Sequence, residues 1–160
     1  TLAVILEHLI SSDLESFIDE KDIKAASYIL SVLLKEWTSA VPDINNALLM
    51  SVRGLTTAGY LVIKYKSIAA REARKVKRAF ATQAEKVRQD SKELNQKYTV
   101  AQIAEAVEKS EDYIAAEEVA GYAEEVAGHF AEFKSSLYRL HDSIVEISRN
   151  ERVDRRFDKD

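Results

Sequence analysis

Glycine and proline are scarce in this chain, and their scarcity restricts the folds open to it. Four glycines and one proline occur in 160 residues. A β-sandwich or β-barrel needs a turn signal about every 8–12 residues. Five such residues cannot supply those turns, whereas a few long helices need only a few breaks. The sequence therefore predicts an all-α protein, in the form of an elongated helical hairpin or bundle.

The composition excludes several other classes of protein. The chain has no cysteine, which excludes a disulfide scaffold, a cysteine-ligated metal site and a cysteine nucleophile. Its hydrophobic fraction of 46% argues against a chain that is disordered throughout. No stretch approaches the roughly 18 uninterrupted apolar residues of a membrane-spanning helix. We therefore expect a soluble cytoplasmic protein that does not contact a membrane.

The first third of the chain, residues 1–59, is predicted to form short helices that serve packing or oligomerisation. Ser12 and Glu15 have the spacing of a capping box, which predicts a brief helix starting at Asp13. Apolar residues recur with a helical period over residues 23–37, which predicts a second helix.

A third helix is predicted to begin near Pro42, because proline is tolerated in the first turn of a helix. Asp43 places a carboxylate near the positive end of the helix dipole. Gly54 is a natural stop for this helix, and Gly59 contributes to a weak break after it. Beyond this break we expect one long basic helix over residues 60–97.

Charge is strongly segregated along the chain, although the net charge is only −4. Residues 64–97 contain eleven basic and four acidic side chains, whereas residues 98–148 contain three basic and eleven acidic ones. Nucleic-acid binding needs basic side chains arrayed along one face, where they neutralise several phosphates together. The candidate phosphate contacts are Lys64, Lys66, Arg71, Arg74, Lys75, Lys77, Arg78, Lys86 and Arg88.

The final segment, residues 99–160, is predicted to form a second long helix that begins with a capping box of Thr99 and Gln102. Its apolar residues alternate at spacings of four and three, as in a coiled coil. The residues of this seam are Val119, Ala123, Val126, Phe130, Phe133, Leu137, Leu140, Ile144 and Ile147. We expect them, apart from Ala123, to form an oligomer or partner interface, or else the contact between two helices of one hairpin. Gly121 and Gly128 lie beside the seam and predict a close helix approach.

Three interpretations of the basic segment stay open. In the first, its cations bind a nucleic acid, and nearby aromatic residues (Tyr60, Tyr65, Phe80 and Tyr98) stack unpaired bases. In the second, the basic segment only packs against the acidic segment in an antiparallel hairpin. In the third, the chain is a structural or adaptor protein whose seam binds a partner helix. Arg149, Arg152 and Arg156 share one helix face and form a possible second basic contact.

Catalysis finds little support in the sequence. The histidines form neither a His-Glu-x-x-His nor a Glu-x-x-His motif, and no glycine-rich phosphate loop is present. His129 lies beside the apolar seam, which favours a packed histidine over a metal ligand. The acidic run between Glu105 and Glu125 is typical of a solvated helix face. We therefore predict no enzyme activity, no metal site and no cofactor.

One stretch of the carboxyl-terminal half resembles a known family. The tetrapeptide Glu108-Lys109-Ser110-Glu111, the amphipathic helix after it and then Ser148-Arg149-Asn150 resemble the UvsY-type recombination mediators of T-even phages. The basic clusters at residues 74–78 and 86–88 are similar to that family's DNA-binding segment. The resemblance implies a ring-like homo-oligomer in the host cytoplasm that binds single-stranded DNA. It also implies two partners, a RecA-like recombinase that the protein loads and the single-strand-binding protein that the recombinase displaces.

Overall fold

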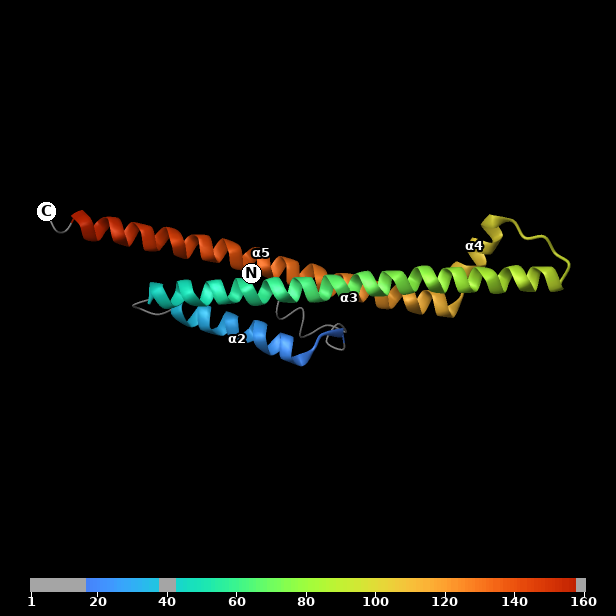
Figure 1. The fold of residues 1–160 in the computed structure, drawn as a ribbon, viewed down its shortest axis with the longest axis horizontal. Coiled ribbons are helices and arrows are strands. Elements are labelled where there is room, and N and C mark those ends of the chain that lie inside the picture. Colours follow the sequence, from blue (N-terminus) through green and yellow to red (C-terminus); the bar gives the residue numbers. More distant parts are fainter. Residues whose placement is uncertain (1–16, 38–42, 158–160) are drawn as a thin grey trace. The chain divides into compact units, whose positions relative to one another are not determined.

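The computed structural model describes residues 17–37 and 43–157, and these ranges contain four helices and no strand (Figure 1). The helices are α2 (Glu20–Trp37), α3 (Ile44–Glu93), α4 (Val100–Glu108) and α5 (Glu111–Phe157). The all-α prediction is confirmed. The brief helix predicted at Asp13 and the placement of Pro42 lie outside the described residues.

Both α2 and α3 begin at an aspartate that caps the helix. The Asp19 carboxylate accepts a hydrogen bond from the backbone N–H of Lys21 at 3.0 Å. The Asp43 carboxylate accepts one from the N–H of Asn46, also at 3.0 Å. Such caps satisfy N–H groups that have no partner inside the helix. The hydrogen bond from Lys21 also lowers the pKa of Asp19 below its ordinary value.

The predicted end of a helix at Gly54 is wrong, because α3 passes through this residue without a break. A Cβ atom on Gly54 would lie 2.8 Å from Cγ2 of Ile29 in α2. Gly54 is therefore a point of close helix packing instead of a stop. The Thr56 hydroxyl donates to the Val52 carbonyl at 3.0 Å and so stays within the helical pattern. The helix likewise continues past residue 59, where the sequence predicted the end of the first segment.

The end of α3 comes at Glu93, earlier than the predicted end at residue 97. Asn95 adopts a positive φ of 52°. Its N–H donates to the Lys92 carbonyl at 3.2 Å, and the N–H of Gln96 donates to the Ser91 carbonyl at 2.9 Å. These two bonds form the Schellman motif that commonly ends a helix. Asparagine adopts this left-handed conformation more readily than most residues.

The predicted second long helix is divided in two. Its capping box is confirmed: the N–H of Gln102 donates to the Thr99 hydroxyl at 3.3 Å, and the N–H of Thr99 donates to the Gln102 side chain at 2.9 Å. The resulting helix, α4, ends before Lys109. The Ser110 hydroxyl donates to the Val107 carbonyl at 2.7 Å, and α5 begins one residue later. The Glu-Lys-Ser-Glu tetrapeptide therefore joins two helices.

The described chain forms two compact units, and both long helices contribute to each. Unit 1 contains α2, α3 as far as Lys64, and α5 from Val126 onward. Unit 2 contains α3 from Tyr65, α4, and α5 as far as Glu125.

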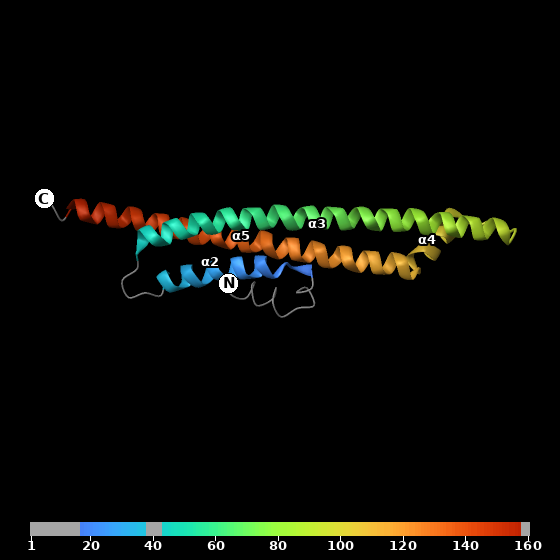
Figure 2. The same ribbon diagram turned by 60° about the horizontal axis from the view of Figure 1, so that its bottom comes forward.

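In unit 1, α2 packs antiparallel to α3. The Asn46 amide donates to the Glu36 carboxylate at 2.8 Å near one end of the helix pair. Lys64 pairs with Asp22 at 2.5 Å near the other end. Figures 1 and 2 show α2 and the later part of α5 running alongside this part of α3. The buried apolar side chains that α2 and α3 supply are Ala26, Ile29, Leu30, Leu33, Ala47, Met50, Ala58, Leu61 and Val62.

The apolar seam of α5 completes this core. Its buried members in unit 1 are Val126, Phe130, Phe133, Leu137 and Ile144. Ser51 on α3 and His141 on α5 also meet, with 2.9 Å between the hydroxyl oxygen and Nδ1. The seam therefore forms the core of a single chain, as in the hairpin interpretation. The prediction that these five residues form an oligomer or partner interface is wrong, because burial within the chain leaves no surface for a partner.

The remaining seam predictions divide in two groups. Val119 and Ile147, at the two ends of the seam, are more than a third exposed, and Leu140 is half-buried. These three are accessible to a partner. Gly121 and Gly128 do not mark a close helix approach, because a Cβ atom on either would meet nothing within 4 Å.

Unit 2 combines a few apolar contacts with polar ones. The Phe80 ring packs edge-on against Tyr113, with 5.8 Å between ring centroids and 72° between ring planes. The Gln83 amide donates to the Asp112 carboxylate. Val107 of α4 is fully buried. Two polar residues of α3, Glu72 and Ser91, are also buried.

Candidate nucleic-acid interface

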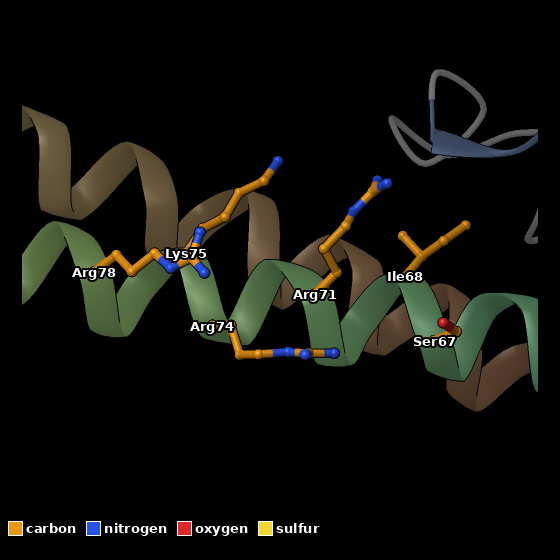
Figure 3. Close-up of a pocket in the computed structure, with 6 residues that line it drawn as sticks. All are labelled: Ser67, Ile68, Arg71, Arg74, Lys75 and Arg78. Carbon is orange, nitrogen blue, oxygen red and sulfur yellow. The ribbon is translucent and has the colours of Figure 1, made fainter.

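Four of the predicted phosphate contacts meet in one hollow on α3. Arg71, Arg74, Lys75 and Arg78 stand at positions i, i+3, i+4 and i+7, a spacing that places side chains on one face of a helix. Together with Ser67 and Ile68 they line a hollow of about 420 Å³, which lies wholly within unit 2 (Figure 3). All four basic side chains are exposed.

One carboxylate lies among these cations. Glu72 is buried, with a side chain only 6% exposed. It accepts hydrogen bonds from Arg71 Nε at 3.0 Å and from Lys75 Nζ at 2.7 Å, one on each of its oxygens. The bond from Lys75, aided by Arg71 and opposed by burial, lowers the pKa of Glu72 below its ordinary value. Glu72 is therefore ionised at neutral pH, and it offsets part of the positive charge of the hollow.

Four other cations of this stretch form no ion pair within the part of the chain that the structure describes. Lys66, Lys77 and Arg78 make no ion pair with any described residue. Arg74 makes none either, and its Nε donates to the Ala70 carbonyl at 3.1 Å. Figure 3 shows that Arg71 and Lys75 project from the same edge of the helix, whereas Arg74 lies along the other edge. The four unpaired cations are available to an anion from solution.

Lys64 is the predicted contact that the structure assigns to another role. Its side chain is only 27% exposed, and it forms ion pairs with Asp22 at 2.5 Å and Asp19 at 3.6 Å. It belongs to unit 1, where it connects α3 to the start of α2. The prediction of Lys64 as a phosphate contact is wrong, because a phosphate would have to displace a carboxylate that is itself mostly buried.

The last two predicted contacts form loose surface pairs. Lys86 lies 3.8 Å from Asp112 on α5, and Arg88 lies 3.4 Å from Glu85 on its own helix. More than half of each of these four side chains is exposed. Pairs of this kind contribute about 0–1 kcal/mol, so an incoming phosphate can replace them at little cost. The pair of Lys86 and Asp112 is the kind of contact expected from a hairpin of basic and acidic helices.

The four aromatic residues proposed for base stacking differ in how far their side chains are exposed to solvent. Tyr65 is buried, and Phe80 is half-buried against Tyr113, so neither presents an open ring face. Tyr60 in unit 1 and Tyr98 in unit 2 are exposed. Stacking on Tyr65 is therefore excluded by its burial in this structure.

A second basic hollow, in which Arg88 is the only predicted phosphate contact, lies at the turn between α3 and α4. Its volume is about 500 Å³. Exposed Tyr98 stands in it beside Lys92 and Lys97. The full lining is Arg88, Ser91, Lys92, Asn95, Gln96, Lys97, Tyr98 and Ile103. The excess of basic residues in the sequence continues as far as Lys97, but the hollow itself depends on the turn that follows α3.

The proposed second basic contact is described only in part. Arg149 is exposed on α5. Arg152 and Arg156 belong to the same helix, but their side chains lie outside the described part of the chain.

None of the helices, within the described ranges, is both long enough and apolar enough to cross a membrane. Among the same residues, no three histidine, aspartate or glutamate side chains come together as a metal-binding group.

Comparison with known proteins assigns this chain to no family. No family model matches it, and no curated protein or solved structure does so either.

Proposed function

We propose that this chain is a non-enzymatic protein that binds single-stranded nucleic acid through the basic face of α3 in unit 2. The observation that carries the proposal is the set of exposed cations that form no ion pair with any described residue, Lys66, Arg74, Lys77 and Arg78, at and beside the hollow. A hairpin held by charge pairing alone leaves these four residues unexplained. Cations in such an array release counterions together when they meet a phosphate backbone.

A preference for single strands is supported by the hollow at the turn between α3 and α4. There the exposed ring of Tyr98 stands beside Lys92 and Lys97. Proteins that bind single strands combine a positive groove with aromatic rings on which bases stack. In a duplex the base faces are already stacked on one another, so a ring of this kind favours an unpaired strand.

The more specific role, loading of a RecA-like recombinase onto DNA coated by single-strand-binding protein, rests on the resemblance to UvsY-type mediators. A homo-oligomer belongs to the same proposal, because several copies of one moderate basic face give avidity for a single strand. In such an assembly the interface would use surface outside the buried part of the α5 seam.

Charge reversal of the unpaired cations tests the proposal. The variant carries Arg74→Glu, Lys77→Glu and Arg78→Glu, and the matched control carries Lys24→Glu, Lys109→Glu and Arg139→Glu, with the same total charge change. Binding of a labelled oligothymidine is followed by fluorescence anisotropy across a range of salt concentrations. We expect the variant to bind at least tenfold more weakly and its salt slope to flatten by about 0.7 for each lost phosphate contact. The control should bind like the parent.

Two results would contradict this function: no binding by the parent protein, or equal weakening of the variant and its control. Sedimentation of the parent tests the oligomer separately. Recombinase filament formation on DNA coated with single-strand-binding protein, with and without the chain, tests the loading role.

A second candidate function, a helical adaptor, is favoured by an apolar groove in unit 1. The groove has a volume of about 520 Å³ and lies between α3 and α5. Tyr60, Ile63 and Tyr138 line it and are all exposed, with Ile63 at 72%. Lys134 lies over the Tyr138 ring at 5.7 Å. A groove of this kind suits the apolar face of a partner helix, and charge reversal on α3 would leave that binding unchanged.

A further inference from the structure

Glu72 stands out among the charged residues of unit 2 because it is acidic, buried and surrounded by cations. A carboxylate in a basic binding face lowers the attraction for phosphate, so its presence there needs a physical explanation. Both of its oxygens are engaged, one by Arg71 and one by Lys75. Because the Glu72 side chain is buried and ionised, releasing both partners would leave a buried charge without compensation, which is strongly unfavourable.

The two cations that Glu72 holds differ from their neighbours in direction. Arg71 and Lys75 project from one edge of α3, whereas Arg74 lies along the other edge (Figure 3). Arg71 reaches Glu72 through Nε, and Lys75 reaches it through its only nitrogen. Their side chains remain 66% and 59% exposed. Both side chains are therefore accessible to solvent, but the ion pairs with Glu72 hold them in one direction.

We propose that Glu72 withholds Arg71 and Lys75 from the nucleic acid and thereby limits the strength of binding at the hollow. Arg74 and Arg78 contact the strand directly, and Glu72 acts through Arg71 and Lys75 as a positioning residue. This inference rests on the proposed nucleic-acid function and adds to it a residue that sets affinity. A protein that passes a strand to another protein must also release it, and an internal carboxylate lowers the barrier to release.

The alternative role for Glu72 is purely structural. Four cations at spacings of three and four on one helix repel one another, and Glu72 relieves that repulsion. A structural role predicts that removing its charge lowers helix stability and weakens binding or leaves it unchanged. The withholding role predicts the opposite effect on binding, since two further cations become free to meet phosphates.

The test replaces Glu72 by its neutral isostere, Glu72→Gln, and measures oligothymidine binding by anisotropy as a function of salt concentration. We expect tighter binding at low salt and a salt slope that is steeper by about 0.7–1.4, which corresponds to one or two additional phosphate contacts. Glu85→Gln is the matched control, because it makes the same chemical change on the same helix at an exposed pair with Arg88. We expect the control to change the slope by less.

A second parent protein, already lacking the two cations that Glu72 holds, keeps the test decisive if Glu72→Gln perturbs folding. In a chain that carries Arg71→Gln and Lys75→Gln, replacement of Glu72 should no longer steepen the slope, because no cation is left for it to release. Circular dichroism checks the helical content of every variant, and Glu72→Met serves as a second neutral replacement if Glu72→Gln loses helix. Weaker or unchanged binding by the folded neutral variants overturns this inference but not the proposed function. A salt slope no steeper than that of Glu85→Gln has the same consequence. Absence of binding by the parent overturns this inference together with the proposed function.

Discussion

Gly54 of α3 lies directly beneath Ile29 of α2, so close that a Cβ atom on the glycine would be 2.8 Å from the isoleucine Cγ2. The same Cβ would also lie 3.7 Å from Cδ1 of Leu137 on α5. The three described helices of unit 1 therefore converge where α3 has no side chain. Because Cγ2 is attached to the Ile29 Cβ atom, it can move away only if the Ile29 side chain or the α2 backbone shifts.

We expect Gly54→Ala to lower the thermal stability of the protein. Alanine improves the helix propensity of an interior position by about 1 kcal/mol, but overpacking of a filled core typically costs about 1–3 kcal/mol. Thermal unfolding followed by circular dichroism measures the balance.

Gly121→Ala and Gly128→Ala are the natural controls for this substitution. Both positions are helical, exposed and open, so an added methyl group meets no neighbour within 4 Å. Each should raise stability by about 1 kcal/mol. A Gly54→Ala protein as stable as these controls would show that α2 is not packed closely against α3.

The hydrogen bond between Ser51 and His141 predicts a histidine tautomer. The Ser51 hydroxyl donates its single proton to the Leu48 carbonyl at 2.8 Å. With its proton on that carbonyl, the hydroxyl is the acceptor in the 2.9 Å contact with His141 Nδ1. Nitrogen-15 chemical shifts should place a proton on Nδ1 of His141.

Removing the buried Ser51 hydroxyl should also cost stability. Ser51→Ala deprives the His141 N–H of its acceptor, and we expect a loss of about 1–3 kcal/mol in the free energy of unfolding. Ser31→Ala is the matched control, because Ser31 likewise donates to a carbonyl three residues earlier but is exposed. Equal stability of the two variants would argue against a specific role for the contact with His141.

Lys64 and Lys66 lie two residues apart and should respond differently to loss of charge. Lys64→Met leaves the mostly buried Asp22 carboxylate without its 2.5 Å partner, so we expect a loss of about 1–3 kcal/mol in folding stability. Oligonucleotide affinity of the folded protein should stay unchanged. Lys66→Met should leave stability unchanged and weaken oligonucleotide binding. Denaturant unfolding and anisotropy together separate the two effects, and the reverse pattern would contradict the placement of both residues.

Glu72 should make the protein sensitive to acid. The ion pairs with Lys75 and Arg71 lower its pKa in the folded state below the ordinary value of 4.5. A carboxyl group of this kind stabilises the fold above its unfolded pKa, and the contribution is lost as the pH falls from 4.5 through the lowered folded value. Melting temperatures measured between neutral pH and pH 3 should therefore fall less steeply for Glu72→Gln than for the parent. Parallel curves would show that the pKa of Glu72 does not differ between the folded and unfolded states.

Features that depend on neighbouring residues in the sequence could be predicted. The capping box of Thr99 and Gln102 is seen in the structure, because it relies on hydrogen bonds spanning three residues. The helix predicted to begin near Pro42 begins at Ile44, after the cap at Asp43. The role of Gly54 could not be predicted in this way. A glycine that ends a helix and a glycine that admits another helix look alike until the neighbouring helix is placed.

The candidate site shows the same division. The array of basic residues on α3 follows from composition and helical spacing, both of which the sequence contains. Which of those cations remain available depends on their partners. Lys64 is occupied by Asp22, which precedes it by 42 residues, whereas Lys66 makes no ion pair with any described residue.

By itself, the sequence determined the helical class, the capping box that starts α4 and the segregation of charge, since these arise from residue types and from hydrogen bonds within one turn. Only the tertiary structure decided that the α5 seam is core and that Glu72 is buried between two cations. Burial and ion pairing are set by groups brought together from distant positions, such as Ser51 and His141, which lie 90 residues apart. Patterns of neighbouring residues in the sequence do not show which distant residues meet, because that depends on how the helices pack.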